Sequence, residues 1–190
     1  MNRNHPFIAA PLLVTVYGLV RLLDGLDGRG PGFFWTAGHA AFLAALVLFV
    51  PALLEMRRRA GRGLLATVTA VVGLGGAGFA MAQIAIDIAV GVLAADDAGM
   101  QRMFQDVKSV PGVGLAVYDA GPPLFYLGLL AAMIHLVAVR AAPVWALAVL
   151  ASGVVVSAVD LNLLPLGGLL MTAALMPLAR PARVRVPEYA

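Results

Sequence analysis

The stretch that decides the fold is residues 64–93, LLATVTAVVGLGGAGFAMAQIAIDIAVGVL. It contains a single charged side chain, Asp87. A helix of about 20 residues, rising about 1.5 Å per residue, crosses the hydrocarbon core of a bilayer, so this run is long enough to cross it at a tilt. The run lacks the alternation of barrel strands, and backbone groups in lipid must pair within their own segment. We therefore expect a transmembrane helix.

Five further apolar runs surround this one. They are residues 7–23, 33–54, 113–139, 142–159 and 161–179. Together the runs predict an all-α integral membrane protein, a single multi-pass domain over 1–190 that forms a six-helix transmembrane bundle. Because only a short connection near Asp160 separates the last two runs, residues 142–179 form either two full spans or a re-entrant hairpin.

The composition favours the same class of protein. Of the 190 residues, 62% are hydrophobic and 12% are charged, whereas soluble domains have about 45–50% and about 25%. So few polar side chains cannot cover a soluble domain of this size, and the same figures exclude intrinsic disorder. The lack of cysteine excludes a disulfide scaffold, cysteine-ligated zinc, iron–sulfur clusters and thiol catalysis.

The distribution of charge orients the bundle. Arg57–Arg59 and Arg62 lie between the second and third spans, which marks that loop as cytoplasmic. With six spans, both termini are then cytoplasmic, residues 180–190 form a cytoplasmic tail, and nine of the 13 basic residues share that side. The nine are Arg3, Arg57, Arg58, Arg59, Arg62, Arg140, Arg180, Arg183 and Arg185. The net charge of +3 therefore reflects orientation in the membrane, and no nucleic-acid partner is expected.

The longest loop, residues 94–112, falls on the outer side. An apolar stripe from Met100 to Val107 recurs at helical spacing, and charged and amide side chains fill the other face. Asp96 or Asp97 is suited to cap the start of such a helix. We expect one amphipathic surface helix over about 97–109, which either covers the ends of the neighbouring spans or acts as a lid over an outer pocket.

Polar side chains inside the spans gather near the outer end. Two pairs at a spacing of four residues share a helix face: Trp35 with His39, and Gln83 with Asp87. Ionisable groups within a membrane are costly and usually face the bundle interior. The predicted ligand-binding residues are Asp87, Asp119, His39, Gln83, Tyr118, Tyr126, Arg21 and Trp35. Among them, we expect two binding carboxylates, Asp87 and Asp119, with His39 as a titratable partner.

Structural alternatives exist for these residues. Arg21 is a permanent cation near this level, and a bridge from it to Asp87 or Asp119 would neutralise one carboxylate. The second carboxylate would then need a proton, His39 or a bound cation. Trp35 near the outer boundary would also suit an interfacial anchor. The cluster has the residue types for acid–base chemistry or a hard metal ion, but no metal site is assigned.

A glycine-rich motif, GLGGAG at 73–78, matches the dinucleotide-binding pattern but lies within a span, without the strand and βαβ unit that the pattern requires. No cofactor is therefore expected. Small residues there, and Gly167-Gly168, instead suit close packing of helices.

The sequence is compatible with three functions. The first is an outer-facing polar pocket that binds a small ligand, cation or proton for transport or sensing. The second is an intramembrane enzyme acting on a lipid-like or prenyl substrate, which requires a hydrophobic groove beside the polar cluster. The third is an assembly subunit whose small-residue faces bind a membrane-protein partner or a second copy; its polar cluster would be self-paired, without a cavity. The single lysine suggests a GC-rich bacterial genome, and the expected location is the bacterial cytoplasmic (inner) membrane.

Overall fold

The computed structural model describes residues 4–26 and 30–180, and in these residues it is helical with no strand. The α-helices are α1 (Pro6–Asp24), α2 (Phe33–Arg59), α3 (Leu64–Leu93), α4 (Asp97–Ser109), α5 (Gly121–Ala138), α6 (Val144–Val159) and α7 (Leu164–Ala179). A π-helical segment, η1 (Gly114–Ala120), precedes α5, and a 3-10 turn, η2 (Leu161–Leu163), precedes α7. Arg3, Arg29 and residues 181–190 of the predicted tail (180–190) lie outside the described residues.

The prediction of an all-α fold is confirmed for the described residues, and several of the helices have the length and composition of membrane spans. Within the described chain, five helical stretches are long and apolar enough to cross a membrane: α1, α2, α3, Gly114–Ala138 and Leu161–Ala179. The remaining apolar helix, α6, has 16 residues. At that length it covers about 24 Å, less than the hydrocarbon core of a typical bilayer.

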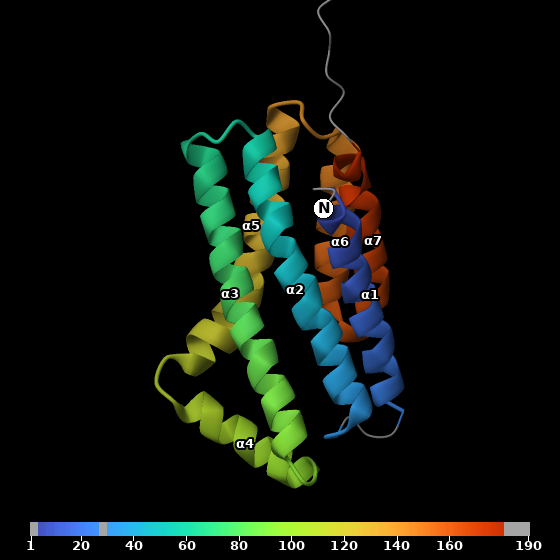
Figure 1. Ribbon diagram of the computed structural model, residues 1–190, viewed down its shortest axis with the longest axis vertical. Coiled ribbons are helices and arrows are strands. Elements are labelled where there is room, and N and C mark those ends of the chain that lie inside the picture. Colours follow the sequence, from blue (N-terminus) through green and yellow to red (C-terminus); the bar gives the residue numbers. More distant parts are fainter. Residues whose placement is uncertain (1–3, 27–29, 181–190) are drawn as a thin grey trace, which may run out of the picture.

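The long helices run side by side along the long axis of the molecule, and α4 lies across one end (Figure 1). Helix α1 packs between α2 and α7, α3 packs between α2 and α5, and α6 packs mainly against α7. Although α5 and α6 follow each other in the chain, they touch only slightly. This separation leaves room for a cavity between them.

Glycine determines which helix faces approach most closely. In α3, Gly73 lies against Gly128 of α5, and a Cβ on Gly76 would overlap the α5 backbone at Phe125. In α7, Gly167 lies against Ser157 of α6, while Gly168 meets the backbone of α1. The predicted role of both glycine groups in close helix packing is therefore confirmed.

Helix α4 has the bounds that the amphipathic pattern predicts. The Asp96 carboxylate accepts a hydrogen bond from the Gly99 N–H at 2.7 Å, so Asp96 is the N-cap. Met100 is buried, and the rest of the apolar stripe is half-buried. Phe104 lies 6.1 Å from the Trp35 ring, measured between centroids, so the stripe faces the bundle.

Candidate functional site

Asp87 lies at the centre of a polar cluster between α2, α3 and η1. Only 6% of the residue is exposed. The Tyr118 hydroxyl donates a hydrogen bond to Oδ1 of Asp87 at 3.2 Å, and Nε2 of His39 lies 3.8 Å from Oδ2. The predicted grouping of Asp87, His39 and Tyr118 therefore has a structural basis: three separate helical segments bring these side chains into one cluster.

His39 is held in a defined orientation. Its Nδ1 lies 2.7 Å from the carbonyl oxygen of Trp35, and a carbonyl can only accept, so Nδ1 carries the hydrogen. When the ring is neutral, Nε2 therefore carries no hydrogen, and its lone pair faces the Asp87 carboxylate. Two acceptors that face each other repel unless a proton or another donor satisfies one of them. This pair is thus built to take up a proton or to meet a donor.

Trp35 joins α2 to α3 near this pair. Its indole N–H donates to the backbone carbonyl of Asp87 at 2.8 Å, and its ring lies 4.2 Å from the His39 ring, measured between centroids. The indole reaches the α3 backbone because position 91 is glycine, where a Cβ would overlap the indole ring. Trp35 therefore helps to position His39 against Asp87.

Tyr17 of α1 completes the wall of the cluster, and sequence reasoning missed it. Its ring meets His39 edge-on at 5.4 Å between centroids and stacks on Phe42 at 4.8 Å. The available signal was spacing, because Tyr17 precedes Arg21 by four residues and so shares a helix face with it.

Asp119 does not join the cluster. Its side chain is exposed, whereas its neighbour Tyr118 reaches Asp87. Successive residues of a helix point about 100° apart, so the two neighbours cannot both face the same partner. The π-helical geometry of η1 also shifts this phase, because Pro122 and Pro123 lack the N–H groups that a regular helix would use.

Arg21 does not bridge to either carboxylate. Among the described residues, the basic side chain within 4 Å of Asp87 is His39, and the buried Nε–H of Arg21 finds no acceptor. Asp87 therefore lacks a permanent counter-ion within bonding distance in this part of the chain. The expectation that Arg21 neutralises one carboxylate is not met, because α1, which carries Arg21, packs against α2 and α7 and, among the described residues, does not contact α3 or η1, which carry the two aspartates.

A cavity of about 500 Å³ begins at Asp87 and extends between α5 and α6. Gln83 and Tyr126, two of the predicted residues, line it together with Tyr17 and Ser157. The remaining wall is apolar and consists of Phe42, Leu46, Ala80, Ile84, Pro122, Pro123, Phe125, Leu127, Leu130, Val154, Ala158, Leu161 and Leu164. His39, Tyr118 and Trp35 contact Asp87 from outside this lining. The site is thus an apolar chamber with a carboxylate at one end.

Metal binding by this cluster has little support in the geometry. In the described parts of the chain, no three His, Cys, Asp or Glu side chains come together to hold a metal ion. The second carboxylate that the sequence proposed for this purpose, Asp119, is exposed.

Comparisons with protein-family models, curated proteins and solved structures give no match to this chain.

Proposed function

We propose that this protein binds an amphipathic molecule in the Asp87 cavity, with a hydrogen-bond donor or cationic group at the carboxylate and an apolar body between α5 and α6. The observation that supports this most is the combination of a buried carboxylate with an almost wholly apolar chamber. A polar cation alone would gain nothing from such walls. A largely apolar ligand with one donor group would use both parts of the site.

The entrance to the cavity supports a ligand that arrives from the membrane. Leu127 of α5 and Leu161 of η2 line the cavity and are 58% and 50% exposed. On a membrane-spanning bundle, exposed leucines at a helix gap face lipid chains rather than water. The ligand class is therefore lipid-like.

The topology that goes with this function is six spans, with α6 as the short one and both termini in the cytoplasm. The arginines at the α2–α3 loop and Arg140 after α5 support this orientation. Helix α4 then lies on the outer side, against the end of α3 and against η1. We place the protein in a bacterial inner membrane.

The lack of cysteine allows this topology to be tested with single-cysteine variants. In intact cells, a membrane-impermeant maleimide should label Gln105→Cys on α4 and leave Ala141→Cys in the α5–α6 loop unlabelled. Both positions are exposed, so a difference in labelling reports the side of the membrane on which each position lies and not its burial. Labelling of Ala141→Cys would contradict the orientation.

Binding is tested with a long-chain alkyl amine and a fatty acid of equal chain length, added to the detergent-purified protein. The amine should raise the melting temperature of the unsubstituted protein and of Asp119→Asn, whereas Asp87→Asn should not respond. The fatty acid should have little effect, because its carboxylate is repelled by Asp87. Asp119→Asn is the matched control, since it removes an exposed carboxylate from the same region. Equal responses of the two variants would contradict the proposal.

An intramembrane enzyme is the second candidate. The cavity supplies the hydrophobic groove that this function requires, and the 3.8 Å approach of His39 to Asp87 would allow a proton to pass between them. Because His39 stands behind Asp87, Asp87 would be the group that touches the substrate. A His39→Gln variant that still binds the amine and lacks turnover of the native ligand would favour the enzyme.

The assembly-subunit alternative has less support. A cavity lies beside the polar cluster, and Gly73, Gly76, Gly167 and Gly168 pack against other helices of the same chain. A Cβ on Gly75 or Gly78 would meet no atom of another helix within 4 Å, so these two glycines remain available on the far face of α3.

A further inference from the structure

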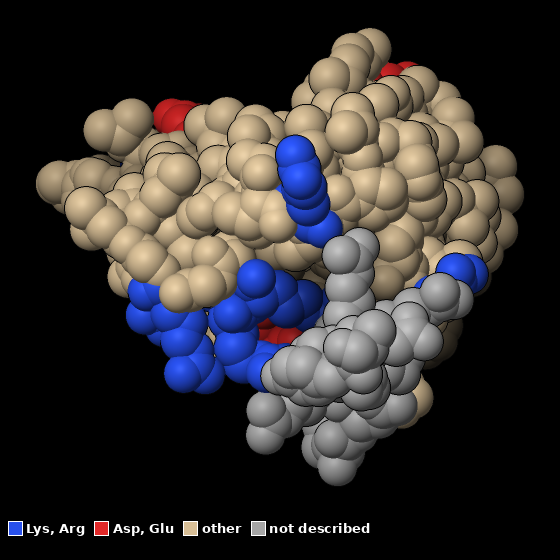
Figure 2. Space-filling model, turned by 90° about the horizontal axis from the view of Figure 1, so that it is seen from above, with Lys and Arg blue, Asp and Glu red and all other residues tan. Residues whose placement is uncertain are grey.

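A second hollow, of about 660 Å³, lies between α1 and α2 at the opposite end of the bundle from Asp87. Figure 2 views this end and shows blue basic side chains gathered around acidic atoms. Arg57, Arg58 and Arg62 form the rim of the hollow, and Leu48, Pro51 and Leu54 form the apolar wall below them. The hollow thus combines a basic rim with an apolar wall directly below it.

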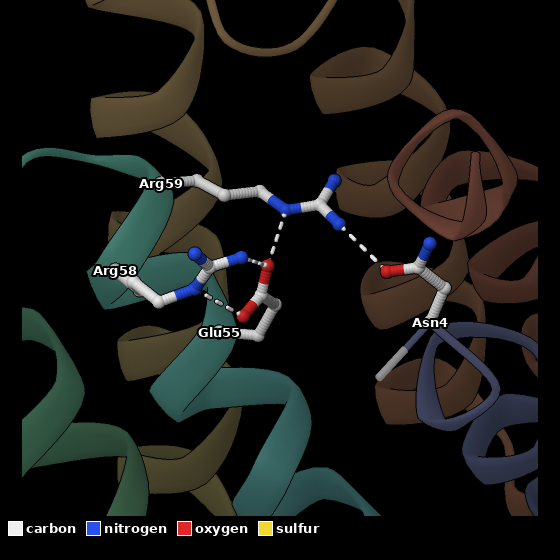
Figure 3. A network of polar contacts seen from close by, with 4 residues as sticks. All are labelled: Asn4, Glu55, Arg58 and Arg59. Carbon is white, nitrogen blue, oxygen red and sulfur yellow. Dashed lines mark hydrogen bonds and ion pairs between the residues drawn. The ribbon is translucent and has the colours of Figure 1, made fainter. Parts of the chain in front are cut away.

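The rim is positively charged even after its internal ion pairs are counted. Glu55 is 7% exposed and accepts hydrogen bonds from Arg58 at 2.7 and 2.6 Å and from Arg59 at 2.8 Å. Arg59 also donates to the side-chain oxygen of Asn4 at 3.0 Å, which ties α2 to the start of α1 (Figure 3). One carboxylate thus holds two guanidinium groups in place and neutralises one of the two charges.

Arg57 and Arg62 add two further positive charges to the one that the ion pairs of Glu55 leave. Neither forms an ion pair with a carboxylate in the described chain. The Nε–H of Arg57 donates to the Thr67 hydroxyl at 3.1 Å, which holds this guanidinium at the start of α3. Its terminal nitrogens can still bind an anion bidentately.

The turn after α2 returns Arg62 to the same place. The Arg62 N–H donates to the carbonyl of Arg57 at 3.2 Å, and the Gly61 N–H donates to that of Arg58 at 3.3 Å, the two bonds of a Schellman motif. Arg62 has φ of 58°, a left-handed conformation that costs a non-glycine residue free energy. The chain therefore keeps an arginine at a position that favours glycine or asparagine.

We propose that this hollow binds an anionic phospholipid, with its phosphate on Arg57 and Arg62 and an acyl chain along Leu48, Pro51 and Leu54. Membranes place an anionic headgroup directly above hydrocarbon, and the hollow has the same order of charge and apolar surface. A free phosphate would use the rim but not the apolar wall. The lipid site is independent of the ligand proposed for the Asp87 cavity.

Native mass spectrometry of the purified full chain, titrated with phosphatidylglycerol or phosphatidylcholine of identical acyl chains, tests this site. We expect phosphatidylglycerol to bind more tightly, and Arg57→Gln combined with Arg62→Gln to weaken it by about tenfold or more. The matched control, Arg102→Gln combined with Arg140→Gln, removes the same charge outside the hollow and should leave binding unchanged. Equal binding of the two lipids, or equal losses in the two double variants, would overturn the proposal.

A further variant, Leu54→Trp, separates the lipid from a free anion. Leu54 is 47% exposed, so the larger side chain fits at the protein surface but fills the apolar wall while every arginine stays in place. We expect this variant to lose phosphatidylglycerol. Retained binding, or displacement of the lipid by inorganic phosphate at millimolar concentration, would overturn the acyl-chain part of the proposal and identify a simple anion site.

Discussion

Replacement of Gly76 by alanine should destabilise the bundle, whereas the same change at Gly75 or Gly78 should not. A Cβ at position 76 would lie 2.5 Å from the carbonyl carbon of Leu124 and 2.7 Å from Cα of Phe125, while contacts below 3.4 Å are already tight. The obstacle is backbone, so no side chain can rotate away. Helices α3 and α5 must separate by close to 1 Å, and Phe125 loses close packing.

The size of the effect follows from two opposing terms. Overpacking of a tight interface costs about 1–3 kcal/mol. Alanine is a better helix former than glycine by about 1 kcal/mol, which partly offsets this cost. At Gly75 and Gly78, a Cβ meets no atom within 4 Å, so only the second term acts. Alanine at position 76 should therefore be about 1–3 kcal/mol less stable than alanine at position 75 or 78.

The assay is equilibrium unfolding of the three variants in one detergent, with circular dichroism to follow helix content. All three changes lie on α3 and add one methyl group, so expression and detergent binding are matched. If alanine at position 76 is as stable as alanine at positions 75 and 78, the glycine-mediated contact between α3 and α5 is not what holds these helices together.

Three further changes probe the Asp87 cluster and the ion pairs of Glu55. Tyr118→Phe removes the hydroxyl that donates to Asp87 and should lower the free energy of unfolding by about 1 kcal/mol, measured in the same titration. An unchanged value would mean that this bond contributes nothing. Gly91→Ala should displace the Trp35 indole and break its 2.8 Å hydrogen bond, which a shift in tryptophan emission would report; an unshifted spectrum would contradict the packing. Glu55→Gln leaves two arginines without their carboxylate and should lower the melting temperature, more so at low salt, and a salt-independent effect would argue against charge.

Local sequence patterns were sufficient to predict where the helices lie. The apolar run at 64–93 is α3 with the same bounds, and the amphipathic pattern at 97–109 is α4 with its Asp96 cap. These predictions succeed because the length of an apolar run, a 3.6-residue period and a capping side chain are all properties of neighbouring residues. The same holds for Asp87, since a lone carboxylate inside a span is visible in the sequence alone.

Tertiary contacts decided what surrounds Asp87. The sequence predicted Asp119 as a second binding carboxylate and Tyr118 only as one of the ligand-binding residues, yet the irregular turn before Pro122 brings Tyr118 to Asp87 and leaves Asp119 exposed. It also offered Arg21 as the counter-ion of Asp87, whereas among the described residues His39 is the basic group within 4 Å of that carboxylate. Such outcomes depend on the rotation of one helix against another, which no local pattern specifies.

The sequence by itself determined that this protein consists of apolar helices with a costly carboxylate, Asp87, inside one of them, because burial of apolar surface and backbone pairing in lipid leave few alternatives. Only the tertiary structure decided that glycine faces draw α3 to α5 and α6 to α7. These close approaches take α6 away from α5, and the space left between them is the cavity that begins at Asp87.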